Sequence, residues 1–129
     1  YWVKEQGPLQ LGQASALHRA GVPLGVGADA PILPYAVHLE LERLVQAGLT
    51  PLEAIRAGTE TSARILGHDA ELGTVAQGKL ADLLLLEPGA DPSADIRATR
   101  RIRLVILGGR PIERETLRNR AVGLAEMQH

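Results

Sequence analysis

Gly25-Val26-Gly27-Ala28-Asp29-Ala30-Pro31 joins a short apolar run to a loop that carries the first carboxylate after that run. The run, Val22 to Val26, predicts a buried strand, and the prolines at 31 and 34 keep the following residues out of a helix until about Ala36. In α/β folds such strands present side chains at the edge of the sheet where sites are built. Asp29 is therefore the first candidate functional residue.

The composition limits the class of protein. The chain has 129 residues, of which 45% are hydrophobic and 22% charged, as in globular domains. Cysteine is absent, which excludes disulfides, thiolate zinc sites and cysteine nucleophiles. A formal net charge of -1 gives no overall bias toward nucleic acid or anionic membranes, and no apolar run approaches the ~18 residues of a membrane span.

Helical patterns fill most of the first half of the chain. Thr50-Pro51-Leu52-Glu53 combines an N-cap threonine, a proline at the first helical position and a glutamate that completes a capping box. Glycines mark the ends of the other helices. The expected helices are 11–20, about 36–47, 51–57 and 60–66.

The pattern changes to strands after Gly73. Leu80 to Leu86 is almost continuously apolar, interrupted by Asp82, and predicts a buried strand. Ile102 to Leu107 predicts a second strand, and Gly108-Gly109 predicts a tight hairpin with positive φ at both positions. Apolar residues spaced from Glu113 onward predict a terminal helix.

The chain thus divides into an α/β part, residues 1–68, and a small β part, residues 69–129. The first part contains one expected strand, and one strand cannot form a sheet; the second contains about three, with uncovered edges. The chain also begins without methionine. We therefore expect a fragment of a longer protein, of the α/β class.

Four stretches, in the order in which they occur in the chain, resemble the C-terminal third of the amidohydrolase superfamily. Their sequences are most similar to those of its imidazolonepropionase-like and Xaa-Pro-dipeptidase-like members. Together they cover about residues 14–112. The stretches are VPLGVGADA (22–30), HLELERLVQAGLTPLEAIRAGTETS (38–62), LGTVAQGKLADLLLL (72–86) and IRLVILGGRP (102–111).

The resemblance implies a fold and an activity. It makes residues 1–68 the end of a distorted (β/α)8 barrel, and residues 69–129 a partial β-sandwich with a C-terminal helix. The implied reaction is hydrolysis of a C–N bond in a small amide, cyclic amide or dipeptide by metal-activated water. The implied cofactor is a divalent ion, one or two zinc ions in the complete enzyme, and the implied location is the cytoplasm, with a homo-oligomer left open.

By the same resemblance, Asp29 is a metal ligand and a catalytic proton shuttle, presented by a turn at Gly27 and Ala28. The family's other ligands, a His-x-His pair, a bridging carboxylated lysine or glutamate and two further histidines, match nothing in this chain. The chain by itself is therefore expected to be inactive on amide substrates.

Structural interpretations stand beside these functional ones. Asp29 could instead cap the next helix or form an Asx turn. His38, His18 and His68 are interpreted as surface or loop histidines, with a ligand or substrate role for His38 as the alternative. Asp82 is interpreted as structural.

Two further functions compete with the enzyme. Eight of the 14 basic residues lie between Arg97 and Arg120, yet no aromatic residue accompanies them and Glu113 and Glu115 interleave. A solvated or oligomer-facing surface is therefore favoured over an Arg-rich nucleic-acid binder, and neither nucleic acid nor membrane is an expected partner. The other rival is a non-catalytic remnant that acts as an interaction module.

Overall fold

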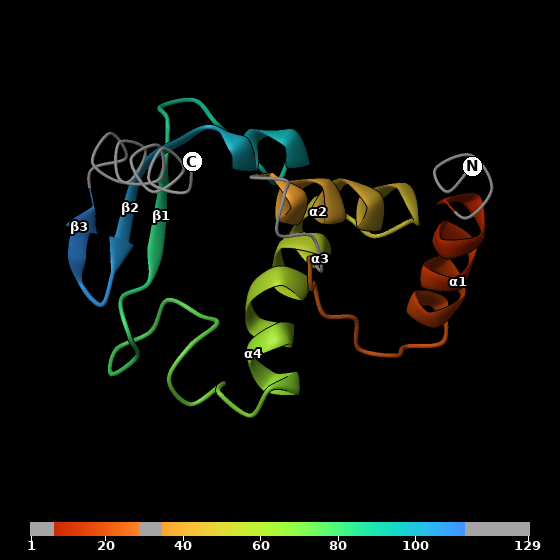
Figure 1. The fold of residues 1–129 in the computed structure, drawn as a ribbon, viewed down its shortest axis with the longest axis horizontal. Helices are drawn as coiled ribbons and strands as arrows, with labels where there is room; N and C mark the ends of the chain where they lie inside the picture. The colour runs from red at the N-terminus through yellow and green to blue at the C-terminus, as the bar shows by residue number, and fades with distance from the viewer. Residues whose placement is uncertain (1–6, 29–34, 113–129) are drawn as a thin grey trace, which may run out of the picture.

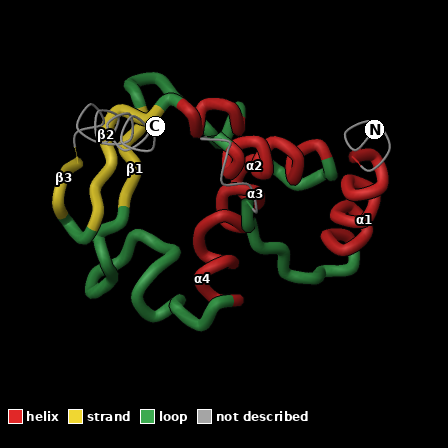
Figure 2. The backbone as a smooth tube through the Cα atoms, viewed as in Figure 1, coloured by secondary structure: helices red, strands yellow, loops and turns green. Residues whose placement is uncertain are grey.

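The computed structural model describes residues 7–28 and 35–112, and it confirms a mixed α/β chain (Figures 1 and 2). Helices occupy the first half and a small sheet the second. The elements are α1 (Gly7–Arg19), α2 (Ala36–Gln46), α3 (Pro51–Arg56), the π-helical turn η2 (Ala57–Thr61), α4 (Ser62–Ile65), β1 (Leu83–Leu86), the 3-10 helix η3 (Ile96–Arg100), β2 (Ile102–Leu107) and β3 (Arg110–Ile112). The terminal helix expected from Glu113 lies outside the described residues.

The expected helix 36–47 and the helix start at Pro51 are confirmed, whereas α1 begins at Gly7, four residues before the expected Leu11. The Thr50 backbone N–H donates to a Glu53 carboxylate oxygen at 2.8 Å, and the Glu53 N–H donates to the Thr50 hydroxyl at 3.3 Å, which is the capping box. Gly48 ends α2 with a φ of 110°, a conformation that glycine adopts without steric cost. Its N–H donates to the Val45 carbonyl, as in a Schellman motif.

The break expected between residues 57 and 60 is wrong. The helix continues from Pro51 to Ile65 through the π turn η2. The Thr59 hydroxyl donates to the Ile55 carbonyl at 2.7 Å, and the Ser62 hydroxyl donates to the Ala57 carbonyl at 2.7 Å. These side-chain bonds occupy carbonyls around the widened turn, so the helix absorbs Gly58 instead of ending there.

The strand expected at Val22 to Val26 is also not formed. Residues 22–28 have no strand assignment, and the side chain of Val22 is exposed. A strand needs a neighbour to hydrogen-bond with, and no other described segment pairs with this one. The Val26 N–H donates instead to the Ser62 hydroxyl oxygen of α4, at 3.1 Å.

The second half forms a three-stranded antiparallel sheet in the order β1-β2-β3. The hairpin at Gly108-Gly109 has the expected positive φ angles of 55° and 78°. The Asp82 carboxylate accepts a hydrogen bond from the Gly108 N–H at 2.6 Å, which confirms a structural role for this residue. The buried character expected of the first strand is wrong, because Leu84 and Leu85 of β1 are 55% and 44% exposed.

The helical half and the sheet are joined through η3, which the sequence pattern did not predict. Ile96 of η3 is buried in one cluster with Leu41 of α2 and Ala54 of α3. Asp95 caps η3 by accepting from the Arg97 N–H at 3.0 Å. The main core of the described residues thus sits where α2, α3 and η3 meet, beside the sheet and not beneath it (Figure 1).

The loop at Gly73 packs against η2 and α4 and is a second contact between the two halves of the chain. Gly73→Ala tests this contact. A Cβ at Gly73 would lie 2.7 Å from the Ala63 Cβ and 3.0 Å from the Glu60 Cα. We expect a loss of about 1–3 kcal/mol in the free energy of unfolding, measured by urea denaturation, because packed backbone cannot move aside.

Gly78→Ala is the matched control. Gly78 has a φ of 89°, close to the 87° of Gly73, but a Cβ there meets nothing within 4 Å. The control measures the cost of a positive φ alone, so Gly73→Ala should be the more destabilising change. Equal losses in the two variants would contradict the close packing of the Gly73 loop on η2.

Candidate functional site

Asp29, the sequence-predicted catalytic and metal-binding residue, lies outside the described residues. Ala28 is the last described residue before it, and the next described residue after it is Tyr35. The segment before Asp29, residues 22–28, is attached to the helices. The Val26 N–H donates to the Ser62 hydroxyl oxygen, and the Val26 side chain packs against the cluster that contains Leu41. The structure therefore establishes where the segment leading to Asp29 is held.

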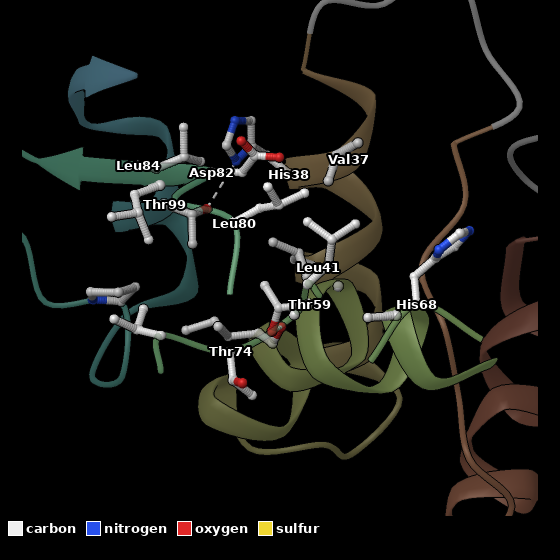
Figure 3. Close-up of a pocket in the computed structure, with 18 of the residues that line it drawn as sticks. Val37, His38, Leu41, Thr59, His68, Thr74, Leu80, Asp82, Leu84 and Thr99 are labelled. Atoms are coloured by element: carbon white, nitrogen blue, oxygen red, sulfur yellow. Dashed lines mark hydrogen bonds between the residues drawn. The ribbon is translucent and has the colours of Figure 1, made fainter. Parts of the chain in front are cut away.

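A groove of about 690 Å³ separates the helices from the sheet. Its lining is mostly apolar, and Figure 3 shows Leu41 and Thr59 of the helices on one side and Leu84 of β1 on the other. A few polar side chains also line it. They are His38, Thr59, His68, Thr74, Asp82 and Thr99.

His38 is the polar group of this groove with the most defined surroundings. It is partly buried, and its Nδ1 lies 3.0 Å from the Thr99 hydroxyl oxygen (dashed line in Figure 3). The Thr99 hydroxyl donates its proton to the Ile96 carbonyl at 2.7 Å. A hydroxyl has one proton, so with that proton on the Ile96 carbonyl, Nδ1 of His38 donates to Thr99 and Nε2 of the neutral ring is an acceptor. His38 is thus a helix histidine, as expected, but it is of intermediate exposure and has a side-chain partner instead of being fully solvated.

The surroundings of His38 favour the neutral ring. Burial lowers the pKa of His38 below its ordinary value of 6.5, and the positive Arg100 lowers it further, while Glu42 opposes both. A neutral imidazole with one free nitrogen can accept a proton or bind a metal ion.

Arg100 ties η3 to α2. Its guanidinium donates to a Glu42 carboxylate oxygen and lies 5.9 Å from the centroid of the Tyr35 ring. Glu42 is the more sheltered partner, with 19% of its side chain exposed. Together with the His38–Thr99 bond, this pair fixes the first turns of α2, which begins seven residues after Asp29 in the sequence.

The described residues do not assemble a metal centre. Nowhere in residues 7–28 and 35–112 do three His, Cys, Asp or Glu side chains gather as ligands would. His38 and Asp82 both line the groove, and one oxygen of the Asp82 carboxylate already accepts the Gly108 N–H. The donors described here therefore do not fit a metal site.

Sequence reasoning missed three features of this region: Ser62, Thr99 and the groove itself. Ser62 had no signal of its own, because only the π turn directs its hydroxyl toward residues 22–28. Thr99 lies in a 3-10 helix without hydrophobic periodicity. The one sequence feature that could have indicated that helix was Asp95, because aspartate is favoured at the N-cap position.

Comparison with known proteins identifies the class. Residues 12–112 match the Amidohydrolase family, which is most of the chain. The chain belongs to this family.

Similar proteins include an imidazolonepropionase of Aeromonas hydrophila, 36% identical over 94 residues, which are 69% of this chain and 22% of that protein. The structure is similar to that of a prolidase candidate from Bifidobacterium longum, with 45% identity and a TM-score of 0.74 over 81% of this chain and 26% of that one. It is also similar to a Xaa-Pro dipeptidase with bound methionine in its active site, with 27% identity and a TM-score of 0.74 over 82% of this chain and 26% of that one. The chain therefore spans about a quarter of the length of these relatives.

Within the described residues, no helix has the length and apolar character needed to cross a membrane.

The lowered pKa of His38 predicts how stability depends on pH. Just below pH 6.5 the unfolded chain binds a proton at this residue more readily than the folded chain does. The free energy of unfolding should therefore decrease as the pH falls from about 7.5 to about 5.5, measured by urea denaturation at each pH. His38→Gln should reduce that decrease.

The same substitution at His68, whose side chain is exposed, is the control for the loss of a histidine. Greater stability at the acid end, or an unaltered pH dependence in His38→Gln, would contradict the preference for neutral His38.

Proposed function

We propose that this chain is the C-terminal part of a metal-dependent amidohydrolase that hydrolyses a C–N bond in a small amide, cyclic amide or dipeptide. In this proposal residues 1–68 contribute the end of a (β/α)8 barrel and residues 69–129 part of the flanking β-sandwich. The observation that carries it is the family match across residues 12–112, because that match includes Asp29 and the segments on both sides of it.

The substrate class is supported by the relatives. The imidazolonepropionase and the Xaa-Pro dipeptidase are named for a cyclic amide and for a dipeptide. Both substrates contain a C–N bond next to a carbonyl group. Since loops of the barrel set specificity in such folds, the choice among these substrates lies with residues beyond those described.

Asp29 is the residue of this chain to which we assign a catalytic role. A divalent ion, zinc in this proposal, would supply a bound water of lowered pKa. The Asp29 carboxylate would serve as one ligand, accept a proton and return it to the departing amine. The remaining ligands would come from outside this chain, since the described donors do not gather and the sequence contains no His-x-His.

A non-catalytic role is the second candidate. It is favoured by the absence, among the described residues, of any group of three metal-binding side chains. In that case the helices and sheet would persist as an interaction module. The two candidates predict different activities when the rest of the family fold is supplied. A part of an enzyme should then support hydrolysis, and an interaction module should not.

The test is a chimera in which residues 12–112 replace the matching segment of the Bifidobacterium longum relative, the structure with 45% identity. We expect the chimera to hydrolyse a Xaa-Pro dipeptide, and Asp29→Asn to lower its kcat/KM by at least about a hundredfold without changing its melting temperature. The chain alone, supplied with zinc, should show no turnover.

Asp69→Asn, in an exposed loop, is the matched control for the loss of a carboxylate and should retain the activity of the chimera. A folded but inactive chimera would favour the interaction module. Full activity in Asp29→Asn would overturn the role of Asp29.

A further inference from the structure

We propose that Ser62 is a positioning residue that fixes the chain leading to Asp29. The proposal rests on the proposed function, because it matters for catalysis only if Asp29 is part of the site. Ser62 is the first residue of α4 and follows the π turn η2 directly. Its hydroxyl contacts the backbone of a segment 36 residues earlier in the sequence.

The direction of the two hydrogen bonds at Ser62 is determined. The hydroxyl donates to the Ala57 carbonyl at 2.7 Å, so its single proton is used there. Its oxygen then accepts the Val26 N–H at 3.1 Å. Because residues 22–28 pair with no strand in the part of the chain that the structure describes, this bond provides an acceptor for the Val26 N–H.

The π turn makes this arrangement available. A helical serine usually bonds to the carbonyl four residues earlier, whereas Ser62 bonds to the one five residues earlier. π turns inside α-helices are frequent at functional sites.

Glycines allow residues 22–28 to lie this close to the helix. A Cβ at Gly25 would be 3.1 Å from the Ser62 hydroxyl oxygen and 3.2 Å from the Ile65 Cδ1. At Gly58 of η2, a Cβ would be 3.2 Å from the Leu41 Cδ2 and 3.7 Å from the Val26 Cγ2. Val26 is therefore held twice, by Ser62 at its amide and by the Leu41 cluster at its side chain.

The consequence for Asp29 follows from chain geometry. Asp29 is three residues after Val26, and three residues span at most about 11 Å. Fixing the Val26 amide therefore fixes the point from which these three residues lead on to Asp29. The contact acts through the backbone, so Ser62 need not touch substrate or metal.

The experiment uses the chain as it is, labelled for NMR, and needs neither metal nor substrate. Amide hydrogen exchange at Val26 is compared with exchange at Ala54, which is fully buried and hydrogen-bonded to the Thr50 carbonyl. In Ser62→Ala we expect exchange at Val26 to accelerate about fivefold relative to Ala54, as the loss of one hydrogen bond predicts. We also expect the carboxyl carbon signal of Asp29 to shift.

Thr59→Val is the matched control, because it removes a hydroxyl from the same π turn whose partner is the Ile55 carbonyl. It should leave Val26 exchange within about twofold of the wild type and the Asp29 signal in place. Gly25→Ala is a second variant, which keeps the Ser62 hydroxyl but crowds it. It should accelerate Val26 exchange and move the Asp29 signal as Ser62→Ala does.

Unchanged exchange at Val26 in Ser62→Ala would overturn the proposal. So would an acceleration shared equally by Ala54, which would mean general loosening, or an Asp29 signal that stays in place. The chimera with Asp29→Asn tests the proposed function separately. If that chimera stays active while Val26 responds to Ser62→Ala, the anchor stands and the catalytic assignment fails.

Discussion

The packing of two separate segments against one widened helical turn is the constraint on which the described structure depends. On one side, residues 22–28 reach η2 and α4 through the Val26–Ser62 hydrogen bond and the close approach of Gly25. On the other, the loop at Gly73 lies directly on Thr59, Glu60 and Ala63. An added Cβ would clash at Gly73 and would crowd Ser62 and Ile65 at Gly25, so the helix from Pro51 to Ile65 acts as a shared support for the parts of the chain before and after it (Figure 2).

The sheet depends on that support only indirectly. Its attachment runs through η3, where Ile96 enters the cluster of Leu41 and Ala54, and through the bonds of Thr99 and Arg100 to α2. The sheet therefore stands beside the helices, and the groove lies between them. Leucines of β1 border this groove on the sheet side, which explains why a strand with the composition of a buried one is half exposed here.

Local signals made much of the fold predictable. The capping box at Thr50, the glycines after each helix and the Gly108-Gly109 hairpin act within a few residues, so the sequence alone reveals them. The helix expected to end at Ala57 continues because Thr59 and Ser62 bond to carbonyls of the widened turn, and the strand expected at Val22 is not formed because no described segment pairs with it. Of the candidate site, the family could be inferred from the sequence. The contact between His38 and Thr99 could not be inferred from the sequence, because the two residues are 61 positions apart.

The hydrogen bond between Asp82 and Gly108 has a consequence for strand pairing. Four consecutive leucines form β1, so sliding this strand by one position would put the same side chain at nearly every place. A hydrophobic pattern cannot select one alignment from such a sequence. A polar side chain at one end does so instead: the Asp82 carboxylate accepts a hydrogen bond from the Gly108 N–H. The interruption of an apolar run by one aspartate is thus what gives four interchangeable leucines a single alignment.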